Sequence, residues 1–561
     1  MKRFIPPLLI VVLISLGIAS PVKAHASLVR SVPQSGEVLT ESPPEIVLEF
    51  TEEIDPGVAK VELFDAGGQL IAAGPGVVDP NAPRVLQLEV DPLPDGAYSA
   101  VWRVRSAVDG HITNGAVGFS IGEASAPASL LPPPGTPDPA AAVPSNAETI
   151  ARWLAYLSAA VAVGSLSFGF LIWRPAYQNQ TDKSEEFEEA VRRRMGQLAL
   201  GSLILLGIAT FSFALIQTAE ALEVPVWGLS GTALSQMFLG YIGRLLMARL
   251  ILVILLGVLV ARLPSPGTGS KIVWWSILLI GSALLLTFSL QGHSAARGSV
   301  IGVVMIWLHL AGMTVWLGGL PMLFFVLRQA NAMAPTIFPR FSQAALISVG
   351  MIAATGLYNG LIFVRTGEAL TATTYGRALI AKTGIFAFLL MLGAINLLYL
   401  SPRLRAGVQG AWYGLSRTIR TEMALGIALL LAVGVLSGVA PAFEALQAHQ
   451  QQGIIETASV DGVDMMLRVM PGESGDNEIG VEFTDTRPGA ANVPPEVLLR
   501  LTATSMDMGT QQVEATSVDG VRYTVRGSYF PMVGPWELEI IIRRPGFNDV
   551  RKTFALNISS P

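Results

Sequence analysis

The sequence predicts a multidomain protein in which an all-β sandwich at each end flanks a central bundle of eight transmembrane α-helices. Three observations predict this fold class. Only 14% of the 561 residues are charged, against roughly 25% in soluble domains, and the mean hydropathy is +0.52. Eight apolar runs are each long enough to cross a bilayer, which takes about 20 residues. The segments on either side alternate polar and apolar residues, as half-buried strands do.

Residues 1–24 are predicted to be a secretory signal peptide. A basic start precedes the apolar stretch Leu8–Ile18, which is too short to span a bilayer, and small residues stand near Ala24. Cleavage after Ala24 makes His25 the first residue of an exported protein. An uncleaved membrane anchor is the alternative.

The region 25–122 has the pattern of a small antiparallel β-sandwich. Ile46, Leu48 and Phe50, for example, alternate along one face of a strand. Residues 123–147 follow with seven prolines among alanines and serines. This composition predicts a stiff, extended linker without a core of its own.

The region 148–442 is predicted to be the membrane domain. Its apolar runs centre on 150–173, 196–219, 242–261, 273–291, 299–327, 342–364, 377–400 and 421–440. The region 443–561 comprises a polar tether and then alternating segments such as Trp536–Ile540, which predict a second β-sandwich.

The loop charges predict which helix ends face the cytoplasm, because positive loops stay on that side. The expected outer side carries Arg297, Arg365 and Arg377. The expected inner side carries Arg174, Lys183, Arg192, Arg193, Arg194, Arg262, Lys271, Arg328, Arg340, Arg403, Arg405, Arg417 and Arg420. The chain is therefore expected to be multi-pass in a bacterial cytoplasmic (inner) membrane, with both β domains outside.

The histidines are the first candidate metal ligands, because the chain has no cysteine and only five histidines. As a mature N-terminus, His25 offers both its amine and its imidazole to one ion. Asp109 and His111 are two positions apart, so they project to one side of an extended segment. Nitrogen and oxygen ligands of this kind suit Cu(II). The alternative is that Asp109 belongs to a plain turn and His111 is a surface residue.

Several motifs run along the first β domain: His25–Leu28, Ser31–Pro33, Leu48–Phe50, Trp102–Ser106, Asp109–His111, Gly115 and Phe119. Over its whole length this domain closely resembles the CopC family of exported copper-binding proteins, which implies an immunoglobulin-like or cupredoxin-like sandwich. In that family the mature N-terminal histidine and the Asp-x-His pair bind Cu(II). The resemblance therefore implies a Cu(II) site of His25, Asp109 and His111. A methionine-rich Cu(I) site is not expected, because residues 25–122 contain no methionine.

The membrane region carries the motifs Gly292–Ser294, Leu308–His309, Val315–Leu320 and Tyr375–Lys382. In order and spacing these resemble the CopD family, which is sometimes fused to CopC, as in the YcnJ-like proteins. This resemblance implies copper uptake across the cytoplasmic membrane.

The fifth span carries side chains that could bind copper within the membrane. His309 lies about 15 Å down a helix that starts near Ser299, close to the middle of a ~30 Å core. Met305, His309 and Met313 are four residues apart and share one helical face, and such ligands suit Cu(I). Alternatively, His309 bonds to a neighbouring helix while the methionines fill gaps. His293 is expected at the outer mouth, either to receive the ion or as an ordinary loop residue.

Other polar side chains have more than one interpretation. Lys382 and Glu422 fall within spans, where they are expected to pair or to reach the interface. In the last domain, segments that resemble YtkA-like β domains carry Met506, Met508 and Met532. These form a soft Cu(I) site if the two segments meet, and core packing is the alternative.

The sequence thus predicts a copper transport protein, with import as the expected direction and no enzymatic activity. The alternatives are a haem-binding membrane redox protein with His293 and His309 as axial ligands, and a copper-sequestering or resistance protein without transport. An ATP-driven pump is not expected, because no Walker A loop is present and Ala381–Gly384 falls within a span instead of a soluble phosphorylation domain. The expected partners are copper ions, membrane lipid and a copper reductase or cytoplasmic copper chaperone. Nucleic acid is not expected, because the net charge is -5 and there is no basic block.

Overall fold

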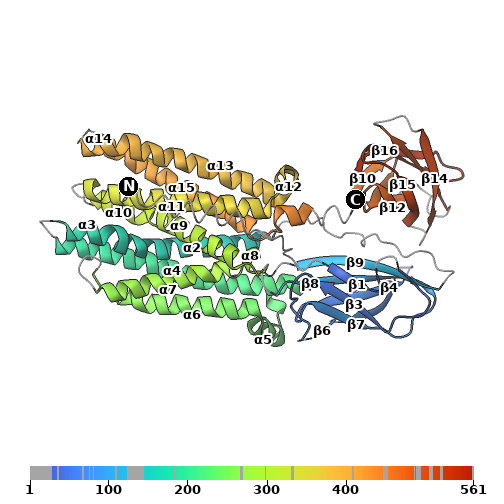
Figure 1. Ribbon diagram of the computed structural model, residues 1–561, viewed down its shortest axis with the longest axis horizontal. Coiled ribbons are helices and arrows are strands. Elements are labelled where there is room, and N and C mark those ends of the chain that lie inside the picture. Colours follow the sequence, from blue (N-terminus) through green and yellow to red (C-terminus); the bar gives the residue numbers. More distant parts are fainter. Residues whose placement is uncertain are drawn as a thin grey trace. The chain divides into compact units, whose positions relative to one another are not determined.

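The computed structural model confirms the predicted fold class of two β domains and a helical bundle (Figure 1). Each of the three parts has its own hydrophobic core. The described residues are 28–34, 37–65, 69–74, 76–79, 81–107, 110, 112–122, 144–180, 184–265, 270–296, 298–329, 334–406, 408, 410–446, 453–485, 487, 494–504, 509–517 and 522–558.

The first β domain consists of two sheets that enclose one core. Ile46, Leu48 and Phe50 of β3 are buried, as their alternation predicts. The sheets have the strand orders β1-β3-β7-β6 and β2-β9-β8-β4-β5. The strands are β1 (Leu28–Val32), β2 (Glu37–Leu39), β3 (Glu45–Phe50), β4 (Lys60–Asp65), β5 (Leu70–Gly74), β6 (Val77–Val78), β7 (Val85–Glu89), β8 (Gly96–Arg105) and β9 (Ile112–Ile121).

Eight helices in the described chain are long and apolar enough to cross a membrane, as predicted. They are α2 (Asn146–Phe168) with η1 (Gly169–Trp173) and α3 (Arg174–Gln178), α4 (Glu185–Ala221), α6 (Tyr241–Ala261), α7 (Lys271–Ser289), α9 (Val300–Leu317) with α10 (Leu320–Gln329), α11 (Ala334–Phe363), α13 (Thr374–Ile395) with η4 (Asn396–Leu400) and α14 (Ser401–Arg405), and α15 (Ala411–Leu436). Shorter helices connect them: η2 (Val226–Gly228), α5 (Gly231–Leu239), α8 (His293–Ala296) and α12 (Gly367–Ala372).

Close backbone contacts hold the bundle around α2, which packs against α4, α7, α9 and α15. A Cβ atom on Gly318, directly after α9, would lie 1.9 Å from the carbonyl oxygen of Ala160 in α2. Only glycine permits this approach, which is the way that small residues let membrane helices pack closely. Of the eight spans, α2 is the most deeply buried and α13 the least.

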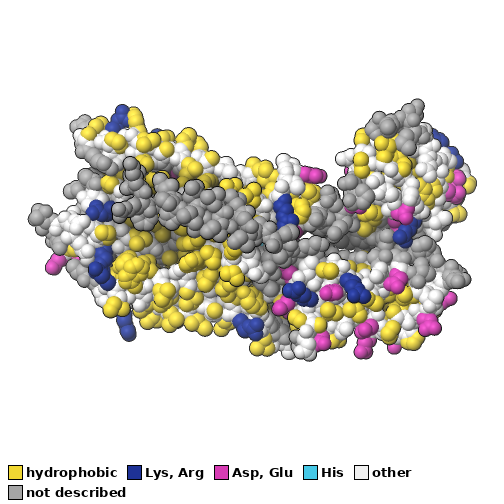
Figure 2. Space-filling model, viewed as in Figure 1, with side chains coloured by type: hydrophobic (Ala, Val, Ile, Leu, Met, Phe, Trp, Pro, Cys, Tyr) yellow, Lys and Arg dark blue, Asp and Glu magenta, His cyan; other side chains and the backbone are white. Residues whose placement is uncertain are grey.

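The flank of the bundle carries many exposed apolar side chains. Ile254 and Val258 of α6, and Ile272 and Leu279 of α7, are each more than half exposed. Figure 2 shows the hydrophobic side chains that cover this flank. A soluble protein rarely exposes so large an apolar patch, whereas lipid covers it without cost.

The last β domain is an eight-stranded sheet of order β10-β11-β12-β15-β14-β13-β16-β17. It curls around a single core, and its edge strands β10 and β17 contact each other, so the sheet nearly closes. The strands are β10 (Ile454–Val460), β11 (Val463–Met470), β12 (Gly475–Asp485), β13 (Glu496–Ala503), β14 (Thr510–Ser517), β15 (Arg522–Phe530), β16 (Gly534–Arg543) and β17 (Val550–Ile558).

Candidate functional site

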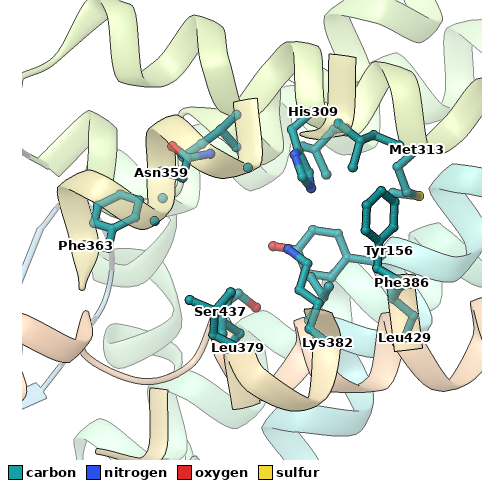
Figure 3. A pocket seen from close by; sticks show the side chains of 18 of the residues that line it. Tyr156, His309, Met313, Asn359, Phe363, Leu379, Lys382, Phe386, Leu429 and Ser437 are labelled. Atoms are coloured by element: carbon teal, nitrogen blue, oxygen red, sulfur yellow. The ribbon is translucent and has the colours of Figure 1, made fainter. Parts of the chain in front are cut away.

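A cavity of about 580 Å³ lies inside the helical bundle, and we call it the bundle cavity. Most of its wall comes from α9, α11, α13 and α15, at the end of the bundle where α9 and α13 begin and α11 and α15 end. Its lining along α13 runs from Tyr375 to Phe386, a depth of about 16 Å at the helical rise of 1.5 Å per residue. Figure 3 shows that His309 and Lys382 point into this space from opposite sides.

His309 is held by a hydrogen bond that determines which ring nitrogen faces the bundle cavity. Its Nδ1 lies 3.0 Å from the Thr355 hydroxyl oxygen of α11. That hydroxyl lies only 2.6 Å from the Met351 carbonyl oxygen and has a single hydrogen to donate. Thr355 therefore accepts a hydrogen bond from Nδ1–H, and in a neutral imidazole the lone pair is then on Nε2. A metal-binding histidine is oriented in just this way by its second nitrogen.

The methionine stripe of α9 is divided in the structure. Met313 lines the bundle cavity together with His309, and Figure 3 shows both side chains at its wall. Met305 is buried but is not among the lining residues. Four residues advance a helix by about 400°, so each member of the stripe is rotated by about 40° from the last. The side of α9 that carries Met313 faces the cavity, and Met305 lies outside the part of the helix surface that lines it.

His293 lines the same cavity from the first residue of α8. It is buried, and its ring lies edge-on to Phe363, with 6.0 Å between the ring centres. The structure thus brings His293, His309 and Met313 to one space. Among the described residues no group of three or more histidine or acidic side chains is arranged to hold a metal. The soft and neutral ligands of the bundle cavity suit Cu(I) better than a hard divalent ion.

The deep end of the bundle cavity is closed by large side chains. The rings of Trp316 and Phe386 meet edge to face, with 6.1 Å between their centres. Next to them, Leu317 packs against the backbone of α15, where a Cβ on Gly426 would lie 3.3 Å from Leu317 Cδ2. The cavity is therefore a vestibule that is blocked on one side.

The charged groups of the spans have separate environments. Arg152 of α2 donates to Glu148 at 2.6 Å. Glu422 accepts a hydrogen bond of 2.9 Å from the Asn396 side chain. Lys382 lines the bundle cavity, and no ion pair joins it to Glu422 in the described part of the chain. The pairing of Lys382 with Glu422 is therefore not formed.

The predicted Cu(II) ligands His25, Asp109 and His111 lie outside the described residues. Their chain neighbours, however, are described. The backbone N–H of Asp55 donates to the Arg105 carbonyl at 2.8 Å, and the Arg105 guanidinium donates to the Asp55 carboxylate at 2.5 Å.

The described residues that flank the predicted Cu(II) ligands in the chain lie at one end of the sandwich. Leu28, which opens β1, pairs with Phe50, five residues before Asp55. Arg105 closes β8 and pairs with Ile112, which opens β9. The start of β1 and the β8–β9 connection are therefore at the same end of the first β domain.

Of the three methionines predicted for the last domain, the structure describes Met532. It packs against the core of that domain, and its carbonyl oxygen accepts a hydrogen bond of 3.1 Å from Trp536 Nε1. Met506 and Met508 lie outside the described residues.

Three families of known proteins match successive parts of the chain. The CopC domain matches residues 28–122, the N-terminal domain of copper resistance protein D-like proteins matches residues 145–303, and Copper resistance protein D matches residues 335–436. The chain is a CopC–CopD copper protein. The resemblance of its first two domains to CopC and CopD is thereby confirmed.

Individual relatives cover different parts of this CopC–CopD protein. Copper transport protein CutJ of Bacillus subtilis (strain 168) is 28% identical in an alignment of 550 positions that covers 95% of each chain. Copper resistance protein D of Pseudomonas syringae pv. tomato is 27% identical over 177 residues, 29% of this chain and 56% of that protein. The crystal structure of CopC from Methylosinus trichosporium OB3b has 30% sequence identity and a TM-score of 0.17, and the match covers 17% of this chain and 93% of that one.

Two residues of the CopD bundle were not assigned a role from the sequence. Thr355 has no sequence signal, because a threonine in a span often bonds only to its own helix. Lys382 does have a signal in the sequence, because a charged residue within a span usually faces the protein interior or a cavity. The cavity that Lys382 faces is formed only by the packing of the helices.

Proposed function

We propose that this CopC–CopD protein carries copper inward across the cytoplasmic membrane. Cu(II) binds first to the exported CopC domain at His25, Asp109 and His111. Copper then enters the bundle cavity past His293 and passes His309 and Met313. The observation that carries this proposal is the arrangement of His309, which lies deep within an apolar span. Its Nδ1 is hydrogen-bonded to Thr355, and its Nε2 is left to bind an ion.

The ligands of the two sites imply a change of oxidation state. The outer set of nitrogen and oxygen ligands suits Cu(II), whereas His309 and Met313 suit Cu(I). Copper must therefore be reduced before or within the bundle cavity. We propose a copper reductase as the source of the electrons and a cytoplasmic copper chaperone as the acceptor of the ion.

The neighbours of the predicted Cu(II) ligands support a single outer site. β1 begins and β8 ends at the same end of the CopC sandwich, near the ion pair of Asp55 with Arg105. His25 is three residues before Leu28, and Asp109 follows Arg105 by four, so both are within reach of one ion. This arrangement supports one Cu(II) ion shared by His25, Asp109 and His111.

The loop charges and the position of the bundle cavity support the inward direction. Basic residues lie within α3, α10 and α14 and directly after α6, and this side is expected to face the cytoplasm. The cavity lies at the opposite end, where the chain enters α2 and leaves α15. The vestibule is therefore expected to open outside and to be closed toward the cytoplasm by Trp316 and Phe386.

Cellular copper content tests the proposed function. Cells that lose the protein are expected to contain less copper, and His309→Ala is expected to restore none of it while its CopC domain still binds Cu(II). His25→Ala is expected to weaken Cu(II) binding. His449→Ala, in the segment after the last span, is the matched control and should restore copper fully. Higher copper in cells without the protein would contradict import, and full restoration by His309→Ala would contradict the route.

A further inference from the structure

Lys382 gives the bundle cavity a positive charge that the described residues do not balance. The lining contains two cations, Arg152 and Lys382, and no aspartate or glutamate. Arg152 is neutralised by Glu148 at 2.6 Å. For Lys382 no carboxylate of the described chain lies within ion-pair distance, and its side chain points into the cavity (Figure 3). An unpaired charge is costly in a membrane interior, so this geometry calls for an anion.

Copper does not meet this requirement, because a cation cannot balance the positive charge of the ammonium group. The volume also exceeds what an ion needs. A space of about 580 Å³ with mostly apolar walls is typical of sites that bind a small organic molecule. The volume, the apolar walls and the charge of the bundle cavity together fit a molecule with an anionic group and a large apolar part.

The bundle cavity also reaches the lipid-facing surface of the bundle, between α11 and α13. In the described chain these helices make hardly any contact, because α11 packs on α9 while α13 packs on α15. Leu357 and Leu361 of α11 line the cavity, yet they are 59% and 52% exposed. On the other side of the gap, Thr383 follows Lys382 and is exposed. The cavity wall is therefore exposed on the side where the helices would face the acyl chains of a bilayer.

We propose that the bundle cavity binds an anionic amphiphile from the membrane. Its head group, a carboxylate or a phosphate, lies against the Lys382 ammonium, and its acyl chain leaves between α11 and α13. Free fatty acids and acidic phospholipids share this chemistry. The amphiphile balances the charge of Lys382 beside His309 without using His309 as a ligand.

Native mass spectrometry of the full-length protein tests this proposal. The protein is reconstituted in phosphatidylcholine nanodiscs that contain either oleate or phosphatidylglycerol, and the retained lipid is measured as a function of its concentration. Wild-type protein is expected to retain the anionic lipid. Lys382→Met is expected to weaken retention by about tenfold or more. Lys271→Met removes an exposed lysine at the start of α7 and is expected to retain as much as wild type.

A second variant separates binding from loss of the fold. Gly360 lines the cavity on α11, and no atom lies within 4 Å of a Cβ built there. A side chain can therefore begin at position 360 without meeting a neighbouring atom. Gly360→Leu is expected to take up part of the cavity and to reduce retention even if Lys382→Met fails to fold. Retention of oleate alone identifies a fatty acid, and retention of phosphatidylglycerol identifies a phospholipid.

The proposal is overturned if wild type retains no anionic lipid, or if Lys382→Met and Gly360→Leu retain as much as wild type. No copper is present in this experiment. Its readout is therefore separate from the transport assay, and a failure of transport would leave lipid binding intact.

Discussion

The hydrogen bond between His309 and Thr355 allows one substitution to separate copper binding from folding. Thr355→Val keeps the shape of the side chain but removes the hydroxyl that accepts Nδ1–H. Thr355 is 3% exposed, so water does not replace the lost partner. The imidazole then loses its side-chain partner, so the lone pair on Nε2 is aimed less firmly into the bundle cavity.

The size of this effect follows from the geometry. A buried N–H group that loses its partner costs about 1–3 kcal/mol, and 1.4 kcal/mol corresponds to about a factor of ten in affinity. Loss of a residue that orients a metal ligand typically weakens metal binding about 10–100-fold. These values agree, so we expect the Kd for Cu(I) to rise about 10–100-fold in Thr355→Val.

Competition with a chromophoric Cu(I) chelator measures this Kd in detergent-solubilised protein. The matched control is Thr355→Ser, which keeps the hydroxyl and is expected to bind within about threefold of wild type. Thermal unfolding of the three proteins checks that the bundle is intact. Equal Cu(I) affinity in Thr355→Val and wild type would refute the assignment of His309 Nε2 as the ligand.

Three further predictions follow from other parts of the chain. Arg487 holds the pKa of Asp485 below its usual range through a hydrogen bond, so this pair stabilises the last domain above about pH 4 and less as the pH falls through the lowered pKa. Asp485→Asn is expected to accelerate hydrogen exchange in that domain at pH 7, by an amount that shrinks in acid. Gly318→Ala is expected to lower the unfolding temperature, because its Cβ would lie 1.9 Å from the backbone of α2. Met313→Leu is expected to weaken Cu(I) binding more than Met305→Leu does, in the same chelator assay.

Each of these predictions has its own contradicting result. An effect of Asp485→Asn that does not change with pH would exclude the ion pair as its cause. Gly350→Ala is the control for Gly318, because no atom lies within 4 Å of a Cβ built there. Equal unfolding temperatures of the two alanine variants would contradict the tight contact of α9 with α2. A larger effect at Met305 than at Met313 would show that the cavity does not carry the copper ligands.

The fold was largely predictable because lipid imposes simple rules on a sequence. Each span needs about 20 apolar residues, and a strand with one buried face must alternate. Ser299 illustrates how well a helix start is encoded. The helix was expected to start near this residue, and Ser299 caps α9 by accepting a hydrogen bond from Gly302 N–H. These signals are local, so they remain visible without any knowledge of packing.

The site was only partly predictable because it depends on contacts between distant segments. His309 is recognisable from its depth in an apolar span, but its partner Thr355 lies on another helix, 46 residues later. Spacing alone predicts that Met305, His309 and Met313 share one face of α9. Each step of four residues turns the helix by about 40° beyond a full rotation, so Met305 does not line the cavity. The Cu(II) site at His25 and His111 remains a prediction, since both residues lie outside the described part of the chain.

Influx of radioactive copper into proteoliposomes tests the central claim most directly. Protein is reconstituted with its CopC domain outside, and copper is supplied there with a reductant. The account predicts saturable influx through wild-type protein and influx at the level of protein-free liposomes through His309→Ala, while Cu(II) binding outside is unchanged. Influx through His309→Ala at the wild-type rate would contradict the claim that copper crosses the membrane by way of His309.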